Sequence, residues 1–155
     1  MNPDLWDVMH DSYIAAIEGF VPGDVTVTIS IEYLREMWDD GGHQFMVELK
    51  NCTLFEWHAW KTNDSHETDT NVITDLSAIA ENLPEIMTGA QVVDDKLKVY
   101  LDVGSRYGHE LPGKEAGWAW LRYTDTVIKL DHGQIITLDE IKEKAALYWR
   151  KFRRD

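Results

Sequence analysis

The sequence predicts an α+β protein in which a mostly antiparallel, twisted sheet of roughly six to eight short strands packs against a C-terminal helix and two or three short helices. Several segments alternate apolar and polar residues with the period of two that is typical of half-buried strands. The segments between them are mostly short, and a parallel pair would need a crossover of about a dozen residues or more. Hairpins and meanders are therefore expected.

The N-terminal part predicts a short helix and a hairpin. Residues 4–10 suit a short helix that begins near Pro3, and residues 12–21 suit a strand. Pro22-Gly23 then suits a tight turn, because proline fixes its own φ and glycine accepts a positive φ. Residues 24–32 show the cleanest alternation in the chain. Their apolar members are Val25, Val27, Ile29 and Ile31.

A long β segment is predicted over residues 43–60, after a helical turn over 33–38. Phe45, Val47 and Leu49 share one face of this segment. Because its length is unusual for one strand, a bend or bulge is expected near Asn51. Residues 61–71 are polar and predict a loop.

The next part of the chain predicts a second hairpin, formed by residues 86–93 and 96–103 across the turn Asp94-Asp95. A short helix over 75–82, capped by Asp75, is expected before it. Two further strands are predicted at 118–123 and 126–131.

The final helix has the clearest boundary signals. Thr137 is a suitable N-cap, and Glu140 three residues later completes a capping box. An apolar stripe at spacings of three and four residues should pack on the sheet. This stripe consists of Leu138, Ile141, Ala145, Tyr148 and Phe152.

Composition excludes several classes of protein. The 155 residues suit a single domain over 1–155, and a net charge of −13 argues against nucleic-acid and membrane binding. Cys52 is the single cysteine, so no internal disulfide can form, and we interpret it as a small buried hydrophobic residue. The sequence shows neither a signal peptide nor an apolar membrane span, and a cytoplasmic location is expected.

The negative charge is distributed unevenly. Residues 1–34 contain six acidic residues and residues 62–95 contain eight, and neither stretch contains Lys or Arg. Residues 137–155 reverse the balance, with six basic and four acidic residues. The two base-free stretches predict a coherent negative surface that could steer a basic protein partner. An ordinary solvated acidic exterior is the alternative.

Trp118, Trp120 and Arg122 are the first candidate binding residues. Positions two apart share one face of a strand, and tryptophan is enriched at binding hot spots. Packing of both tryptophans in the core under the helices is the alternative. His109, in a glycine-bounded loop, is a further candidate.

Acidic residues provide the remaining candidate binding positions, which are Asp64, Glu67, Asp69, Asp94 and Asp95. The segment from His66 to Thr70 begins like a zinc-protease motif, but Thr70 occupies the place of the second histidine. Phosphate-binding loops, nucleophile elbows and EF-hand spacing are absent from the sequence. We therefore expect no cofactor and no metal, and we name no catalytic residue.

Four segments of the first 60 residues resemble a family of small bacterial proteins without an assigned function. They are Leu5-Trp6-Asp7-Val8-Met9-His10-Asp11, Val21-Pro22-Gly23-Asp24, Tyr33-Leu34-Arg35 and Asn51-Cys52-Thr53-Leu54-Phe55. This resemblance implies no activity and no site. In composition alone, a small acidic α+β domain is also similar to bacterial immunity proteins, which bind and block a basic toxin.

The leading hypothesis is a non-enzymatic interaction protein, immunity-like in character, whose acidic surface binds a basic partner. A second hypothesis is a small-molecule binding domain or an enzyme without a recognised motif. Its aromatic-lined pocket would lie between the sheet and the helices, near Trp118, Trp120 and Arg122 or near His109. A homo-oligomeric structural module is the third, and the sequence leaves the oligomeric state open.

Overall fold

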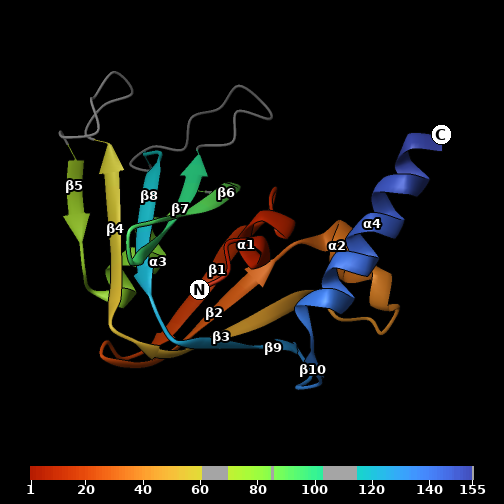
Figure 1. The fold of residues 1–155 in the computed structure, drawn as a ribbon, viewed down its shortest axis with the longest axis horizontal. Helices are drawn as coiled ribbons and strands as arrows, with labels where there is room; N and C mark the ends of the chain where they lie inside the picture. Colours follow the sequence, from red (N-terminus) through yellow and green to blue (C-terminus); the bar gives the residue numbers. More distant parts are fainter. Residues whose placement is uncertain (61–69, 85, 103–114, 155) are drawn as a thin grey trace.

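Two five-stranded antiparallel sheets form the framework of the protein (Figure 1). The structure is a computed structural model that describes residues 1–60, 70–84, 86–102 and 115–154. The first sheet has the strand order β1-β2-β3-β9-β10, and the second has the order β5-β4-β8-β7-β6. The α+β class, the antiparallel pairing and the C-terminal helix of the sequence prediction are confirmed.

The strands of the first sheet are β1 (Tyr13–Gly19), β2 (Gly23–Ser30), β3 (Gln44–Cys52), β9 (Asp125–Leu130) and β10 (Ile135–Ile136). Those of the second sheet are β4 (Leu54–Trp60), β5 (Thr70–Ile73), β6 (Ile86–Val93), β7 (Lys96–Asp102) and β8 (Gly117–Arg122). The helices are α1 (Asp4–Val8), α2 (Glu32–Arg35), α3 (Leu76–Asn82) and α4 (Leu138–Arg154), with the 3₁₀ turn η1 (Glu36–Trp38) after α2.

Both predicted hairpins are present. β1 pairs with β2, and β6 pairs with β7 so that Val93 lies opposite Lys96 across a two-residue turn. Asp94 in that turn has a φ of 57°, which an aspartate adopts more readily than most residues because its short side chain tolerates the left-handed region.

The two sheets join where one long two-stranded ribbon bends. β3 and β4 pair with β9 and β8 along almost their whole length, from Phe45 opposite Leu130 to Ala59 opposite Gly117. The bend lies at Asn51, whose φ is 50° and whose backbone N–H donates to Asp24 Oδ1 at 3.0 Å. The predicted bend near Asn51 is confirmed.

Cys52 follows directly at this corner and is fully buried. Its thiol lies 3.3 Å from the carbonyl oxygen of Leu54, and burial raises the pKa of the thiol. The interpretation of Cys52 as a small buried residue is therefore confirmed.

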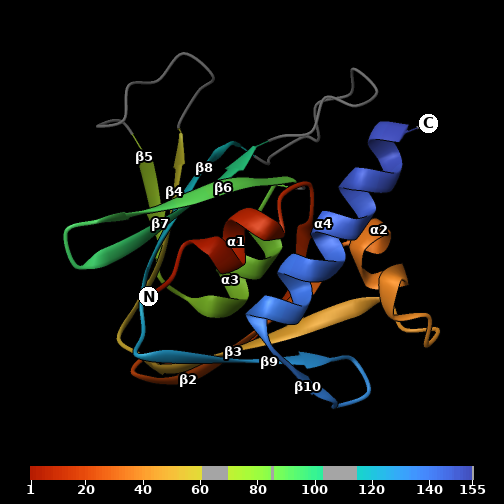
Figure 2. The ribbon, with the colours of Figure 1, turned by 45° about the vertical axis from the view of Figure 1, so that its right-hand side comes forward.

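The hydrophobic core lies between the two sheets, where α1 and α3 also sit (Figure 2). Trp6 of α1 is almost fully buried and donates through Nε1 to the Tyr123 hydroxyl at 3.1 Å. Trp57 of β4 and Ile79 of α3 are fully buried in the same core. α1 and α3 thus fill the angle between the sheets.

Helix α4 begins as predicted but packs differently. The Glu140 backbone N–H donates to Thr137 Oγ1 at 3.1 Å, which confirms the N-cap. Ile141 and Ala145 are buried, whereas Phe152 at the other end of the expected stripe is 64% exposed. α4 packs mainly on α1 and α2, so the expectation that its whole stripe packs on a sheet is wrong.

Two short strands were not expected from the sequence. β5 includes residues 70 and 71, which were assigned to a polar loop, and β10 has only two residues. β5 pairs with β4, and β10 pairs with β9. Such short edge strands depend on the neighbour that they pair with more than on their own pattern. None of the described helices is long and apolar enough to span a bilayer.

Candidate functional site

The predicted stripe of Trp118, Trp120 and Arg122 lies on β8, on the side of the second sheet that faces away from the core. The alternate residues of β8, Ala119 and Leu121, belong to the hydrophobic core, and side chains of a strand alternate between the two faces. The alternative in which both tryptophans pack under the helices is therefore wrong, although Trp118 is only 5% exposed.

Aromatic side chains gather around Trp118 on this outer face. His58 lies opposite Trp118 in the register of β4 and β8, and their rings stack at 5.5 Å with an interplanar angle of 20°. Trp60, on the same strand as His58, meets Trp118 edge-on at 5.4 Å. The His58 imidazole also lies 3.0 Å from a carboxylate oxygen of Glu56.

Lys98 of β7 brings a cation into this aromatic group. Its Nζ lies 4.5 Å from the ring centroid of Trp118, 5.0 Å from that of Tyr100 and 5.4 Å from that of Trp120. Lys98 is only 7% exposed, and the attraction of an ammonium to aromatic faces compensates part of the cost of burying it. We define the aromatic face as His58, Trp60, Lys98, Tyr100, Trp118 and Trp120.

Arg122 and Asp95 continue this side of the sheet at the β6–β7 turn. Arg122 Nη2 lies 2.9 Å from Asp95 Oδ2, and this hydrogen bond lowers the pKa of Asp95. Asp94, next in the turn, is exposed. Two buried donors, Trp118 Nε1 and Arg122 Nε, have no hydrogen-bond partner among the described residues. The structure thus brings Trp118, Trp120, Arg122 and Asp95 together on one side of the sheet.

Four candidates cannot be placed. His109, Asp64, Glu67 and Asp69 lie outside the described residues. Within the described part of the chain, no group of three or more His, Cys, Asp or Glu residues could hold a metal ion.

The two base-free stretches of the sequence meet in the structure. The Asp11 N–H donates to the Met87 carbonyl at 2.9 Å, and the Met87 N–H donates to the Ser12 carbonyl at 2.8 Å. The Ala90 N–H donates to Asp7 Oδ1 at 2.8 Å. Elements of the first stretch therefore lie directly beside elements of the second.

The contacts between elements show the same arrangement. α1 packs against β6, and α3 packs against β1. Each pair joins an element of residues 1–34 with one of residues 62–95. The exposed acidic residues of this region include Asp7, Asp11, Glu18, Asp75 and Glu81, and we define these five as the acidic face. Asp4 of α1 is exposed as well, but it forms an ion pair with Lys142 of α4.

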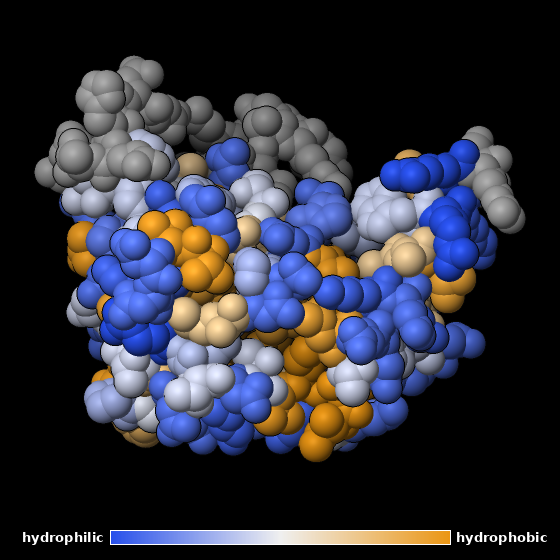
Figure 3. Space-filling model, viewed as in Figure 1, coloured by the Kyte–Doolittle hydropathy of each residue, from blue (hydrophilic) through white to orange (hydrophobic). Residues whose placement is uncertain are grey.

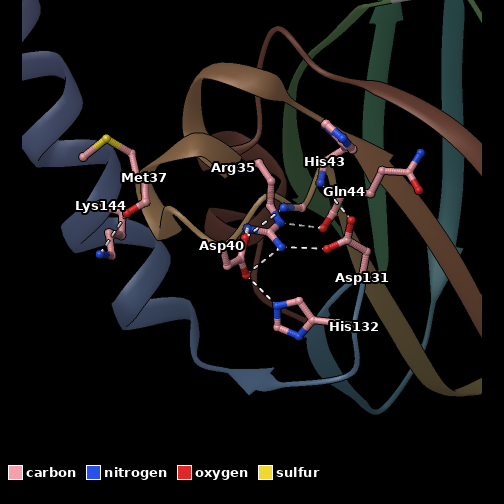
Figure 4. A network of polar contacts seen from close by, with 9 residues as sticks. Arg35, Met37, Asp40, His43, Gln44, Asp131, His132 and Lys144 are labelled. Atoms are coloured by element: carbon pink, nitrogen blue, oxygen red, sulfur yellow. Dashed lines mark hydrogen bonds and ion pairs between the residues drawn. The ribbon is translucent and has the colours of Figure 1, made fainter.

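A buried arginine forms a further charged cluster that the sequence analysis missed (Figure 4). The Arg35 side chain is fully buried and donates to both carboxylate oxygens of Asp40, at 2.6 and 3.0 Å. It also donates to Asp131 Oδ1 at 2.6 Å and to the Gln44 carbonyl at 3.0 Å. His132 Nε2 lies 2.5 Å from Asp40 Oδ2, the same oxygen that accepts from Arg35 Nη2.

These bonds stabilise the charged forms of both acids. The hydrogen bonds from Arg35 and then from His132 hold the pKa of Asp40 well below its usual range. Burial alone would raise the pKa of Asp131, but the His43 backbone N–H and Arg35 outweigh it and lower the value to about 2. The cluster ties the segment after α2 to the β9–β10 turn, and its chemistry is that of a structural ion pair. Only the adjacent Asp39-Asp40 and Gly41-Gly42 marked this segment in the sequence.

Two pockets formed by described residues lie away from the aromatic face. One of about 430 Å³ lies beside Arg35 and is lined by Glu36, Asp39 and Asp40. Another of about 370 Å³ separates α2 and η1 from α4, with Tyr33, Met37 and Phe152 in its lining. Neither is lined by Trp118, Trp120 or Arg122, so neither is the pocket expected near those residues.

The fold defines an α+β protein of two antiparallel sheets joined by a bent ribbon, with a cluster of aromatic side chains on the outer side of the second sheet. No protein-family model, curated protein or solved structure matches the chain. The resemblance of the first 60 residues to small bacterial proteins therefore stays a prediction.

Proposed function

We propose that this protein is a non-enzymatic interaction protein whose acidic face binds a basic protein. The observation that carries the proposal is the contact between the two base-free stretches, through α1 with β6 and α3 with β1. Acidic residues that are scattered in sequence are thereby carried on neighbouring elements, and we infer that their charges act together. Such a region attracts a basic partner and raises its rate of association.

The distribution of the basic residues supports the proposal. Lys50 lies within ion-pair distance of Asp24 and Glu48, and the buried Arg35 binds Asp40 and Asp131. These cations neutralise acids at the corner and beside η1, and residues 1–34 and 62–95 supply no Lys or Arg. The acidic face therefore depends on other segments, or on a partner, for positive charge.

An immunity-like role is the biological setting that this chemistry suits, because an immunity protein binds and blocks a basic toxin. A neighbouring gene for a basic, toxin-like protein would support this role. A surrounding metabolic operon would instead favour the hypothesis of a small-molecule binding domain.

A charge-reversal experiment tests the acidic face itself. The probe is a labelled Lys- and Arg-rich peptide, and the readout is its fluorescence anisotropy with increasing protein. In the test variant, Glu18→Lys and Glu81→Lys reverse two exposed charges of the face, on β1 and α3. The control variant carries Glu36→Lys and Asp125→Lys, which reverse two exposed charges away from this face and from α4 and change the net charge equally.

We expect the test variant to bind about tenfold more weakly than the unchanged protein, and the control variant to lose about threefold or less. Binding should also weaken as ionic strength rises from about 0.01 M to about 0.15 M, because the Debye length falls from about 30 Å to about 8 Å. An equal loss in both variants would show that net charge alone, rather than this face, governs the binding.

A further inference from the structure

The solvent side of α4 has an ordered pattern of charge. Ile141 and Ala145 mark the buried side of this helix. On the opposite side, four exposed residues follow one another at spacings of three, four and three. We define them as the outer stripe: Glu140, Glu143, Leu147 and Arg150. This spacing keeps the four side chains on one line along the helix, as in a coiled-coil seam.

Charge along the outer stripe changes sign at its centre. The N-terminal turns carry Glu140 and Glu143, and the C-terminal turns carry Arg150, with Arg153 one turn further. Leu147 lies between them and is 48% exposed. The helix dipole favours this order of charges in any single helix, but it gives no reason for an exposed leucine at the centre.

The geometry points to a second copy of this chain as the partner of the outer stripe. We propose that two copies of α4 pair antiparallel across a twofold axis near Leu147. The acidic turns of each helix then face the basic turns of the other, and the two leucines come together at the centre. A twofold contact of this kind is self-complementary and closes as a dimer.

Two lysines of α4 contact other parts of the same chain and lie outside the outer stripe. Lys142 Nζ lies 2.7 Å from Asp4 Oδ2, and Lys144 Nζ donates to the Met37 carbonyl at 3.1 Å. Both contacts point these side chains toward the N-terminal segment and η1. The outer stripe therefore keeps an uninterrupted order from acid to base.

The position of α4 leaves room for a second helix. α4 lies at one end of the molecule, and its C-terminal turns extend past the sheets (Figures 1 and 2). Figure 3 shows this end of the helix standing clear of the neighbouring surface, with hydrophilic, intermediate and hydrophobic residues on the visible side. The acidic face belongs to α1, β1 and α3, so the dimer and the proposed function involve different surfaces.

Sedimentation measurements over a range of protein concentration test the dimer. A single helix pair is a small interface, so we expect association between about 10 µM and about 1 mM. Leu147→Gln should weaken the association about tenfold or more. Ile135→Gln, which changes another exposed apolar residue outside α4, is the matched control and should leave the association unchanged.

Mixing two charge variants gives a test that a purely structural effect cannot imitate. Glu140→Arg with Glu143→Arg makes the outer stripe wholly basic, and Arg150→Glu with Arg153→Glu makes it wholly acidic. Each variant alone should lose association about tenfold or more, because like charges then face each other. An equimolar mixture of the two variants should associate again, because opposite charges then face each other. Circular dichroism of each variant is the control for folding.

A chain that stays monomeric up to about 1 mM would overturn the proposal, since even a weak specific contact populates a dimer there. An association that survives Leu147→Gln, or a mixture of charge variants that stays monomeric, would overturn it too. None of these outcomes bears on binding of the basic peptide by the acidic face.

Discussion

Arg35 and Asp131 are 96 positions apart in sequence, yet Nη2 of the arginine donates to Oδ1 of the aspartate at 2.6 Å. The guanidinium is fully buried, while the Asp131 side chain stays 28% exposed. A buried arginine is stabilised only while its acceptors remain in place. Arg35 therefore makes the fold dependent on the position of the β9–β10 turn relative to α2.

Replacement of Arg35 should destabilise the protein strongly. Arg35→Ala removes the donor of two carboxylates and leaves a cavity, and we expect the free energy of unfolding to fall by about 3 kcal/mol. Denaturant unfolding measures the change. Lys142→Ala, which removes an exposed ion pair with Asp4, is the control and should lower the stability much less, because water screens an exposed pair. Similar losses in the two variants would contradict a special role for Arg35.

The stability of the Arg35 cluster should depend on pH at the acid end. The pKa of Asp131 in the folded protein is about 2, against an ordinary value of 3.8, and the pKa of Asp40 is lowered as well. A lowered carboxyl pKa stabilises the folded state above the unfolded pKa, and this contribution disappears as pH falls through the folded pKa. Unfolding measured from about pH 5 to about pH 2 should show this loss of stability. In Arg35→Met the stability should fall less over this pH range. A pH profile equal to that of the unchanged protein would contradict the assignment of this pH dependence to the Arg35 cluster.

The adjacent glycines Gly41 and Gly42 should respond differently to substitution. A Cβ at Gly42 would overlap the Arg35 guanidinium and the Asp131 carboxylate, so Gly42→Ala should cost about 2 kcal/mol or more. Gly41 has a φ of 76° and open space around it, so only backbone strain opposes Gly41→Ala, at about 1 kcal/mol. Thermal unfolding of both variants compares them directly. If Gly42→Ala lowered the stability less than Gly41→Ala, the side chains of Arg35 and Asp131 would be able to move aside at little cost, which would contradict the prediction.

Lys98 should stabilise the aromatic face through its charge. Lys98→Met keeps a similar shape but removes the ammonium from three aromatic rings, and we expect a loss of about 1 to 2 kcal/mol. Lys96→Met removes a cation that lies 5.3 Å from the Trp120 ring, and should cost less than about 1 kcal/mol. Denaturant unfolding and tryptophan fluorescence report on both variants. Equal stability of Lys98→Met and the unchanged protein would contradict the cation–π assignment.

Local sequence patterns predicted most individual elements correctly. The alternation of residues 24–32, the turn at Asp94-Asp95, the bend near Asn51 and the N-cap at Thr137 all depend on neighbours in sequence. The period of a strand, the residues of a turn and the cap of a helix depend on residues close in sequence, so they can be predicted from the sequence alone. β5 and β10 were missed because two to four residues carry too little pattern and are stabilised by pairing with a neighbouring strand.

The candidate site could be predicted only in part. The shared face of Trp118, Trp120 and Arg122 followed from their spacing, but the cation that lies over the two tryptophan rings comes from Lys98 on another strand. Arg35 gave no usable signal, because an arginine in a sequence is far more often exposed than buried. Its role appears only when Asp40 and Asp131 approach it from two sides.

By itself the sequence determined the α+β class, the hairpins, the capped final helix and an uneven charge, since each depends on residues that are near one another in the chain. Tertiary structure alone decided that a bent ribbon joins two sheets and that Trp118 and Trp120 face away from the core. It also brought the two base-free stretches together through α1 with β6 and α3 with β1. These are long-range pairings, whose energies depend on which distant surfaces meet and are buried.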